Sequence, residues 1–209
     1  MSRIAWYFDP ISPFAYLQWP RVRELARRHA VDFRPVLLAG LLGHHGHKGP
    51  AEIAGKRLFT YRHVTWLARQ QDVPLVFPPA HPFNPLAALR LCLAAGNTPD
   101  AIGAVFDWIW AQGNAADDAA ALAPLGERLG IADVAAAIAA PEVKAQLRAN
   151  TEAAIAGGVF GVPTLVVDGE LFWGNDAFEF AQAFLDDPGL LDAHEMARLA
   201  ALPEGARRG

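Results

Sequence analysis

The stretch FDPISPFAYL, residues 8–17, joins a short apolar run to a helix-like run. The run before it, RIAWYF at residues 3–8, is rich in β-branched and aromatic side chains and predicts a strand. That strand ends at the Asp-Pro pair, because proline cannot donate a hydrogen bond to a sheet ladder. Ser12 is a typical N-cap and Pro13 a typical first helical residue. The stretch therefore predicts a strand, a tight loop and a helix that begins next to Ser12.

Downstream of this stretch, residues 14–30 have helical character, with a kink or break expected at Pro20. Residues 31–38, VDFRPVLL, predict a second strand. A strand, helix, strand order with a crossover of this length favours parallel pairing. The first 40 residues therefore read as a βαβ unit.

The pattern then changes to helices alone, and the strand signal returns only near the end of the chain. Residues 162–175, VPTLVVDGELFWGN, are two apolar runs joined by Asp-Gly, which predicts a hairpin. Residues 176–187 close the pattern as an amphipathic helix.

Two α/β segments that flank an all-helical insertion are the simplest description, because together they complete one sheet that neither could bury alone. We predict a discontinuous α/β domain and a separate helical insertion. The α/β domain comprises residues 1–44 and 156–187, the helical insertion residues 45–155, and the C-terminal tail residues 188–209.

Composition narrows the range of functions. Eighteen Lys and Arg against 22 Asp and Glu give a formal charge of −4 over 209 residues, which opposes binding to nucleic acid. No stretch approaches the roughly 20 apolar residues needed to span a membrane, and the first ten residues meet Asp9 too soon for a signal peptide. We expect a cytoplasmic protein. Cys92 is the only cysteine, in a run with helical apolar spacing, and is expected to lie in the core.

The motifs DPISPFAYL after the first strand and GVFGVPTLVVDGELFWGND at residues 158–176 carry a family resemblance. The chain resembles the DsbA-like thioredoxin fold with a helical insertion. Within that group it is similar to the 2-hydroxychromene-2-carboxylate isomerases and the kappa-class glutathione transferases. The redox enzymes of this fold carry C-x-x-C at the start of the first helix, where this chain has Ser12, Pro13, Phe14 and Ala15.

Without a thiol in this position, dithiol redox chemistry is excluded, because no protein thiolate can attack a disulfide there. The resemblance implies that the sulfur belongs to glutathione, held at Ser12, Pro13 and Phe14. The Ser12 hydroxyl at a helix N-terminus suits a thiolate, since it can donate a charge-assisted hydrogen bond beside free amides. Taken by its local sequence alone, Ser12 is first explained as an ordinary N-cap.

Three other positions of the implied glutathione site follow from the resemblance. Val162 and Pro163 match the residues whose backbone pairs with the cofactor, with a cis bond between them. Asn175 and Asp176 match the pair that binds the γ-glutamyl end, although their local sequence is also explained as a helix cap. His47 stands where such enzymes usually have Asn. His63 stands where an acidic residue is common.

Cationic and polar residues around the insertion are candidates for holding a substrate carboxylate. We predict that Lys48, Asn84 and Arg90 contact the substrate. Any one of them is also explained as an ordinary polar or charged residue at the surface. Three histidines lie close together at residues 44–47, but no carboxylate lies between them and Glu52, and we expect no metal site.

The resemblance implies a glutathione-dependent isomerase that converts 2-hydroxychromene-2-carboxylate to trans-o-hydroxybenzylidenepyruvate in aromatic catabolism. It also implies a homodimer acting on a small aromatic carboxylate. Two alternatives stay open: a kappa-like transferase that conjugates electrophiles, and a module that binds glutathione or a peptide without turnover.

Overall fold

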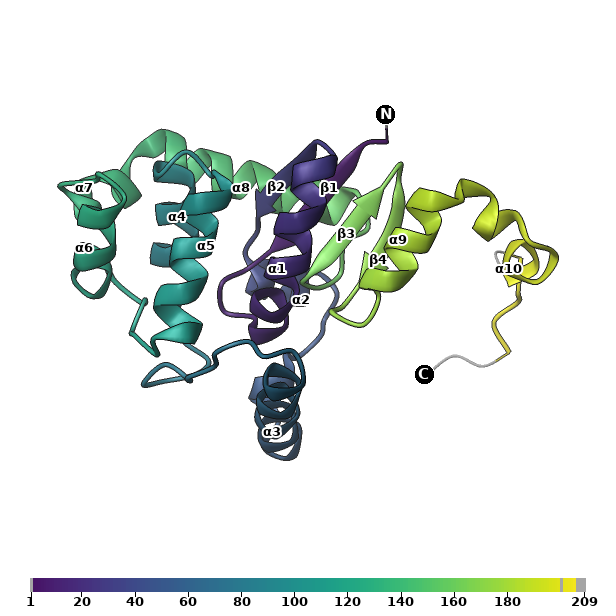
Figure 1. The fold of residues 1–209 in the computed structure, drawn as a ribbon, viewed down its shortest axis with the longest axis horizontal. Coiled ribbons are helices and arrows are strands. Elements are labelled where there is room, and N and C mark those ends of the chain that lie inside the picture. The colour runs from purple at the N-terminus through teal and green to yellow at the C-terminus, as the bar shows by residue number, and fades with distance from the viewer. Residues whose placement is uncertain (1, 200, 206–209) are drawn as a thin grey trace.

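A four-stranded mixed sheet forms the centre of the molecule (Figure 1). The computed structural model describes residues 2–199 and 201–205. The strand order is β2-β1-β3-β4, with β1 parallel to β2 and antiparallel to β3, and β3 antiparallel to β4. The parallel pairing of the first two strands is confirmed. The strands are β1 (Ile4–Phe8), β2 (Val31–Pro35), β3 (Thr164–Val167) and β4 (Glu170–Trp173).

The hairpin between β3 and β4 turns at Asp168 and Gly169, as the Asp-Gly pair predicts. Both residues have left-handed backbone, with φ of 51° and 102°, which is the conformation that a two-residue hairpin turn requires. The β1–β3 register pairs Tyr7 with Thr164. The residues that follow β1 and precede β3 therefore leave the sheet at the same edge.

Helices cover both faces of the sheet. Trp6 and Phe8 of β1 point to the face covered by α1 and α9, while Tyr7 points to the opposite face, where α2 and α8 lie. Helix α1 continues through Pro20 without the break that this proline predicts. The covering helices are α1 (Pro13–Arg28), α2 (Leu38–His44), α8 (Pro141–Ala156) and α9 (Phe178–Asp186).

The helices between residues 86 and 139 form a block on one side of the sheet, α10 lies past α9 on the other side, and α3 projects away from the rest of the molecule (Figure 1). Within residues 100–113, apolar side chains at helical spacing from Ile102 to Trp110 predict a helix, but α5 passes into the π-helix η2 after Phe106. The remaining elements are η1 (Pro50–Glu52), α3 (Ala54–Gln70), α4 (Leu86–Ala94), α5 (Pro99–Phe106), η2 (Asp107–Ala111), α6 (Ala119–Arg128), α7 (Val134–Ala139), η3 (Pro188–Asp192) and α10 (His194–Leu199).

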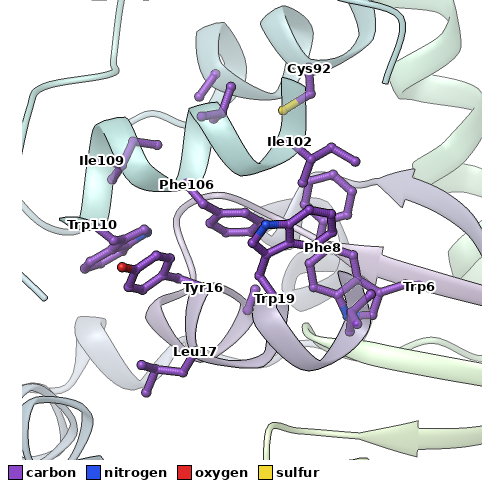
Figure 2. Close-up of a cluster of buried hydrophobic side chains, with 14 of the residues drawn as sticks. Trp6, Phe8, Tyr16, Leu17, Trp19, Cys92, Ile102, Phe106, Ile109 and Trp110 are labelled. Carbon is purple, nitrogen blue, oxygen red and sulfur yellow. The ribbon is translucent and has the colours of Figure 1, made fainter. Parts of the chain in front are cut away.

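An aromatic core joins the sheet to the helical block (Figure 2). The ring of Trp6 stacks on that of Phe8 with centroids 4.6 Å apart, and the ring centroid of Phe106, on α5, lies 5.8 Å from that of Phe8. Cys92 of α4 is fully buried in the same cluster, as expected, and burial raises the pKa of its thiol. Side chains from β1, α1 and α5 thus make one continuous core.

Helix α8 falls within the predicted insertion, residues 45–155, yet it packs against both α4 and β2. The division of the chain into two units stays a prediction. Of the predicted tail, residues 188–209, the structure places η3 and α10, while residues 200 and 206–209 lie outside the described part. Among the residues described, no helix has the length and apolar character needed to cross a membrane.

Candidate functional site

The loop between β1 and α1 presents Ser12 at the N-terminus of α1. Ser12 is 6% exposed and caps the helix as predicted: its Oγ accepts a hydrogen bond of 3.3 Å from the Ala15 amide. No group among the described residues accepts a hydrogen bond from the Ser12 hydroxyl. The hydroxyl is therefore able to donate to an anion at the helix N-terminus, where amides and dipole favour negative charge.

Asp9 lies at the base of this loop and is fully buried. Its Oδ1 accepts from the Ile11 amide at 3.0 Å and its Oδ2 accepts from the Leu38 amide at 2.9 Å. Burial raises the pKa of Asp9 to about 7, although both amide hydrogen bonds act to lower it. One carboxyl group thus joins the Ser12 loop to the start of α2. The sequence pattern indicates only that a strand ends at Asp9 and does not predict this link.

Val162 and Pro163 lie at the same edge of the sheet as Ser12, because Thr164 pairs with Tyr7 near the end of β1. The bond between them is cis, as the resemblance implies. The Pro163 carbonyl accepts from the Gly174 amide at 2.9 Å. In the described part of the chain, neither the N–H nor the C=O of Val162 has a hydrogen-bond partner. These two groups have the pairing capacity that an extended peptide would use.

The turn that contains Asn175 and Asp176 is held by α1. The Gln18 side chain donates to the Gly174 carbonyl at 2.8 Å, and Arg21 Nη2 donates to both the carbonyl and Oδ1 of Asn175 at 2.7 and 2.6 Å. The local explanation of this pair as a helix cap is wrong: the N-cap of α9 is Ala177, without a side-chain cap. Tertiary hydrogen bonds to α1 therefore take the place of a local cap, and they bring the turn to the side of the Ser12 helix.

The remaining predicted residues lie in different surroundings. Phe14 contacts the ring of His63 on α3, with centroids 6.2 Å apart. His47 and Lys48 are exposed beyond α2. Among the described residues, no contact joins Lys48, Asn84 or Arg90 to the Ser12 loop. The roles of these three residues in substrate binding stay predictions. Asn84 is exposed and its Oδ1 accepts from the Leu86 amide at 3.1 Å, and Arg90 has a buried Nε without a hydrogen-bond partner.

Helix α3 has a composition unlike the rest of this acidic chain. It contains no Asp or Glu but carries four Lys or Arg residues, and no ion pair of the described residues involves them. Phe59 and Trp66 are 68% and 55% exposed. An open groove on this helix combines aromatic rings with two guanidinium groups. It is lined by Tyr61, Arg62, Thr65, Trp66, Arg69 and Phe77.

The triple-histidine segment does not gather a metal-binding set. The rings of His44, His45 and His47 lie 4.9 to 5.9 Å apart along the segment. Over residues 2–199 and 201–205, no three His, Cys, Asp or Glu side chains come together in a way that could hold a metal ion.

Comparison with known proteins agrees with this arrangement. A family model described as the DSBA-like thioredoxin domain matches residues 3–186. The 2-hydroxychromene-2-carboxylate isomerase of Sphingobium xenophagum is 30% identical over 191 residues, which cover 88% of this chain and 98% of that protein. The chain belongs to the 2-hydroxychromene-2-carboxylate isomerase family of DSBA-like thioredoxin proteins.

Two further comparisons support the fold and show similarity to a second group of proteins. A solved structure of a 2-hydroxychromene-2-carboxylate isomerase superposes with a TM-score of 0.77, at 24% identity, over 91% of this chain and 97% of that chain. Human glutathione S-transferase kappa 1 is 25% identical over 206 residues, which cover 87% of this chain and 89% of that protein. The predicted thioredoxin-like fold with a helical insertion is confirmed.

Proposed function

We propose that this chain is a glutathione-dependent isomerase that converts 2-hydroxychromene-2-carboxylate to trans-o-hydroxybenzylidenepyruvate. The observation that carries the proposal is the Ser12 hydroxyl, buried at the N-terminus of α1 with its proton free, beside the unpaired backbone groups of Val162. The names of the relatives support both the reaction and the cofactor, since they include isomerases of this substrate and a glutathione transferase.

The residues present fit glutathione. Its thiolate would meet the Ser12 hydroxyl, its backbone would pair with Val162, and its γ-glutamyl end would lie at Asn175 and Asp176. When bound, glutathione would supply a nucleophile whose reversible addition to a conjugated carbon turns a double bond into a freely rotating single bond. Its departure restores the double bond, and no glutathione is consumed.

The task of Ser12 is to keep this sulfur ionised. A thiol with a pKa near 8.5 is only about 3% ionised at pH 7, and a pKa two units lower raises this to roughly three quarters, which needs about 2.7 kcal/mol. A charge-assisted hydrogen bond contributes about 1.5–3 kcal/mol and a helix N-terminus roughly 0.3–2 kcal/mol. The hydroxyl and the helix together contribute about 1.8–5 kcal/mol, a range that includes the free energy required.

Helix α3 is the proposed wall for the aromatic substrate. It reaches the Ser12 helix through the contact of His63 with Phe14. Its unpaired cations, such as Arg62, suit a carboxylate, and exposed rings such as Trp66 suit an aromatic acceptor. This assigns the substrate end to α3 in addition to the predicted Lys48, Asn84 and Arg90.

One assay separates the proposal from its alternatives. The protein is given the chromene carboxylate and, separately, an electrophilic aryl halide, each with and without glutathione. Isomerisation that needs glutathione without consuming it supports the proposal. Consumption of one glutathione per turnover indicates the kappa-like transferase, and binding without turnover indicates a binding module.

The Ser12→Ala variant tests the role of the hydroxyl. Thr98→Ala is the matched control, because Thr98 caps α5 in the same manner, accepting from the Ala101 amide at 3.2 Å. Both variants are expected to lose about 0.5–2 kcal/mol of stability. Only Ser12→Ala is expected to lose turnover, by about 10- to 150-fold for a lost bond of 1.5–3 kcal/mol. Equal turnover in the two variants would refute the assignment.

A further inference from the structure

The peptide unit that joins Ile11 to Ser12 is held on both sides. Its N–H donates to the Asp9 carbonyl at 2.9 Å, and its C=O lies 2.9 Å from Nε2 of His81. His81 is contributed by the segment between α3 and α4, seventy residues further along the chain. The backbone that delivers Ser12 to the helix N-terminus therefore depends on a side chain from the predicted insertion.

The hydrogen-bond partners fix the tautomer of His81. A carbonyl oxygen can only accept, so Nε2 must carry the hydrogen. Burial lowers the pKa of His81, with the Ile11 carbonyl acting in the opposite direction. In the neutral ring Nδ1 is then an acceptor, and it lies 2.7 Å from the Tyr61 hydroxyl. The Tyr61 hydroxyl, on α3, also lies 2.7 Å from the carbonyl oxygen of His81, so that its one proton is shared between these two acceptors. Tyr61 thus contacts both the ring and the backbone of His81 and holds the ring in the orientation that Ile11 needs.

A second side chain from the insertion supports the same loop. The indole N–H of Trp110, in the π-helix η2, donates to the Pro10 carbonyl at 2.8 Å. The rings of Trp110 and His81 contact each other, with centroids 5.4 Å apart. Two consecutive carbonyls before Ser12 thus each receive a ring N–H from a distant part of the chain.

We infer that His81, oriented by Tyr61, is a positioning residue that sets the Ser12 hydroxyl against the sulfur of bound glutathione. This inference rests on the proposed function and adds to it the residues that keep Ser12 in place. Two hydrogen bonds thus link α3, the proposed substrate wall, through His81 to the Ile11 carbonyl, which directly precedes Ser12.

Three variants and one control test the inference. His81→Leu removes the donor to Ile11, His81→Gln restores an amide donor in the position of Nε2, and Tyr61→Phe removes the hydroxyl that orients the ring. Tyr16→Phe is the matched control: the Tyr16 hydroxyl donates to the Pro74 carbonyl at 2.5 Å, in the same connecting segment, without touching Ile11.

The first readout is the pKa of the thiol of bound glutathione, which is measured from the absorbance of the thiolate as a function of pH. We expect His81→Leu to raise this pKa by about one unit, which lowers the thiolate fraction at pH 7 from roughly three quarters to about one quarter, and to lower kcat about threefold with little change in KM for glutathione. His81→Gln recovers most of this loss, and Tyr61→Phe loses less. An unchanged thiol pKa in His81→Leu overturns the inference, as does an equal change in Tyr16→Phe.

The second readout needs no glutathione. Hydrogen exchange at the Ser12 amide is expected to be at least tenfold faster in His81→Leu than in the unaltered protein, and unchanged in Tyr16→Phe. If the protein binds no glutathione, the proposed function fails while this exchange still decides whether His81 holds the loop. Equal exchange rates in His81→Leu and Tyr16→Phe would overturn the inference whatever the cofactor.

Discussion

Replacement of Asp9 by Asn should change how the stability of the protein depends on pH. Asp9 is fully buried, and its pKa is raised from 3.8 to about 7, chiefly by burial. A carboxyl group whose pKa is higher in the folded state binds its proton more tightly there. Between about pH 4 and 7 the folded state therefore holds the extra proton, and the free energy of unfolding falls as pH rises.

The magnitude follows from the two pKa values. A difference of about three units corresponds to about 4 kcal/mol, lost progressively between pH 4 and pH 7. The Asn side chain does not titrate in this range. Asp9 accepts from the amides of Ile11 and Leu38, and Asn has only one accepting oxygen, so its NH2 group leaves one of these two amides without a partner. An unsatisfied buried amide costs about 1–3 kcal/mol. Between pH 5 and pH 8 the unaltered protein should thus lose about 2–3 kcal/mol that Asp9→Asn does not lose, so that Asp9→Asn is the more stable of the two at pH 8.

Urea unfolding of both proteins at pH 5, 6, 7 and 8 measures this change in the difference between them. The difference between the two curves isolates Asp9, because other titrating groups contribute to both. Parallel curves, with Asp9→Asn displaced by a constant free energy at all four pH values, would show that the carboxyl group is not held protonated and would refute the reasoning.

Three other predictions concern packing. Gln18→Leu should cost about 2–4 kcal/mol, since it leaves a buried indole N–H of β1 and a carbonyl after β4 without their partner, and calorimetry should show a lower Tm. Gly126→Ala should cost about 1–3 kcal/mol in urea unfolding because a Cβ there would lie 2.1 Å from Val134, whereas Gly55→Ala, with open space around it, should leave stability unchanged or slightly higher. Cys92 should react with a thiol reagent only after denaturation; reaction in the folded protein would contradict its burial.

Local signals in the sequence were enough to predict much of the fold. The strand before Asp9, the cap at Ser12 and the hairpin turn at Asp168 and Gly169 are each set by residues within a few positions of one another. All three were confirmed. Patterns of this kind can be read along the chain because the physical cause is local.

The features that the sequence did not predict depend on distant partners. The apolar stripe within residues 100–113 fits a regular helix equally well, so it does not reveal the π-helix from which Trp110 donates to the Pro10 carbonyl. Asn175 is a residue type typical of helix N-caps, but its side chain accepts a hydrogen bond from Arg21 and does not cap α9. The only local signal for His81 is an aromatic and proline-rich segment, and its partner Ile11 is known only once the chain is folded.

The position of β1 has a consequence for synthesis on the ribosome. One neighbour, β2, follows after a single helix, whereas the other, β3, emerges only after the whole helical block has been made. Until then the growing polypeptide presents β1 with an unpaired edge, a template for association with other chains. A product terminated before residue 162 should for this reason aggregate, and nascent chains of that length are natural clients for chaperones.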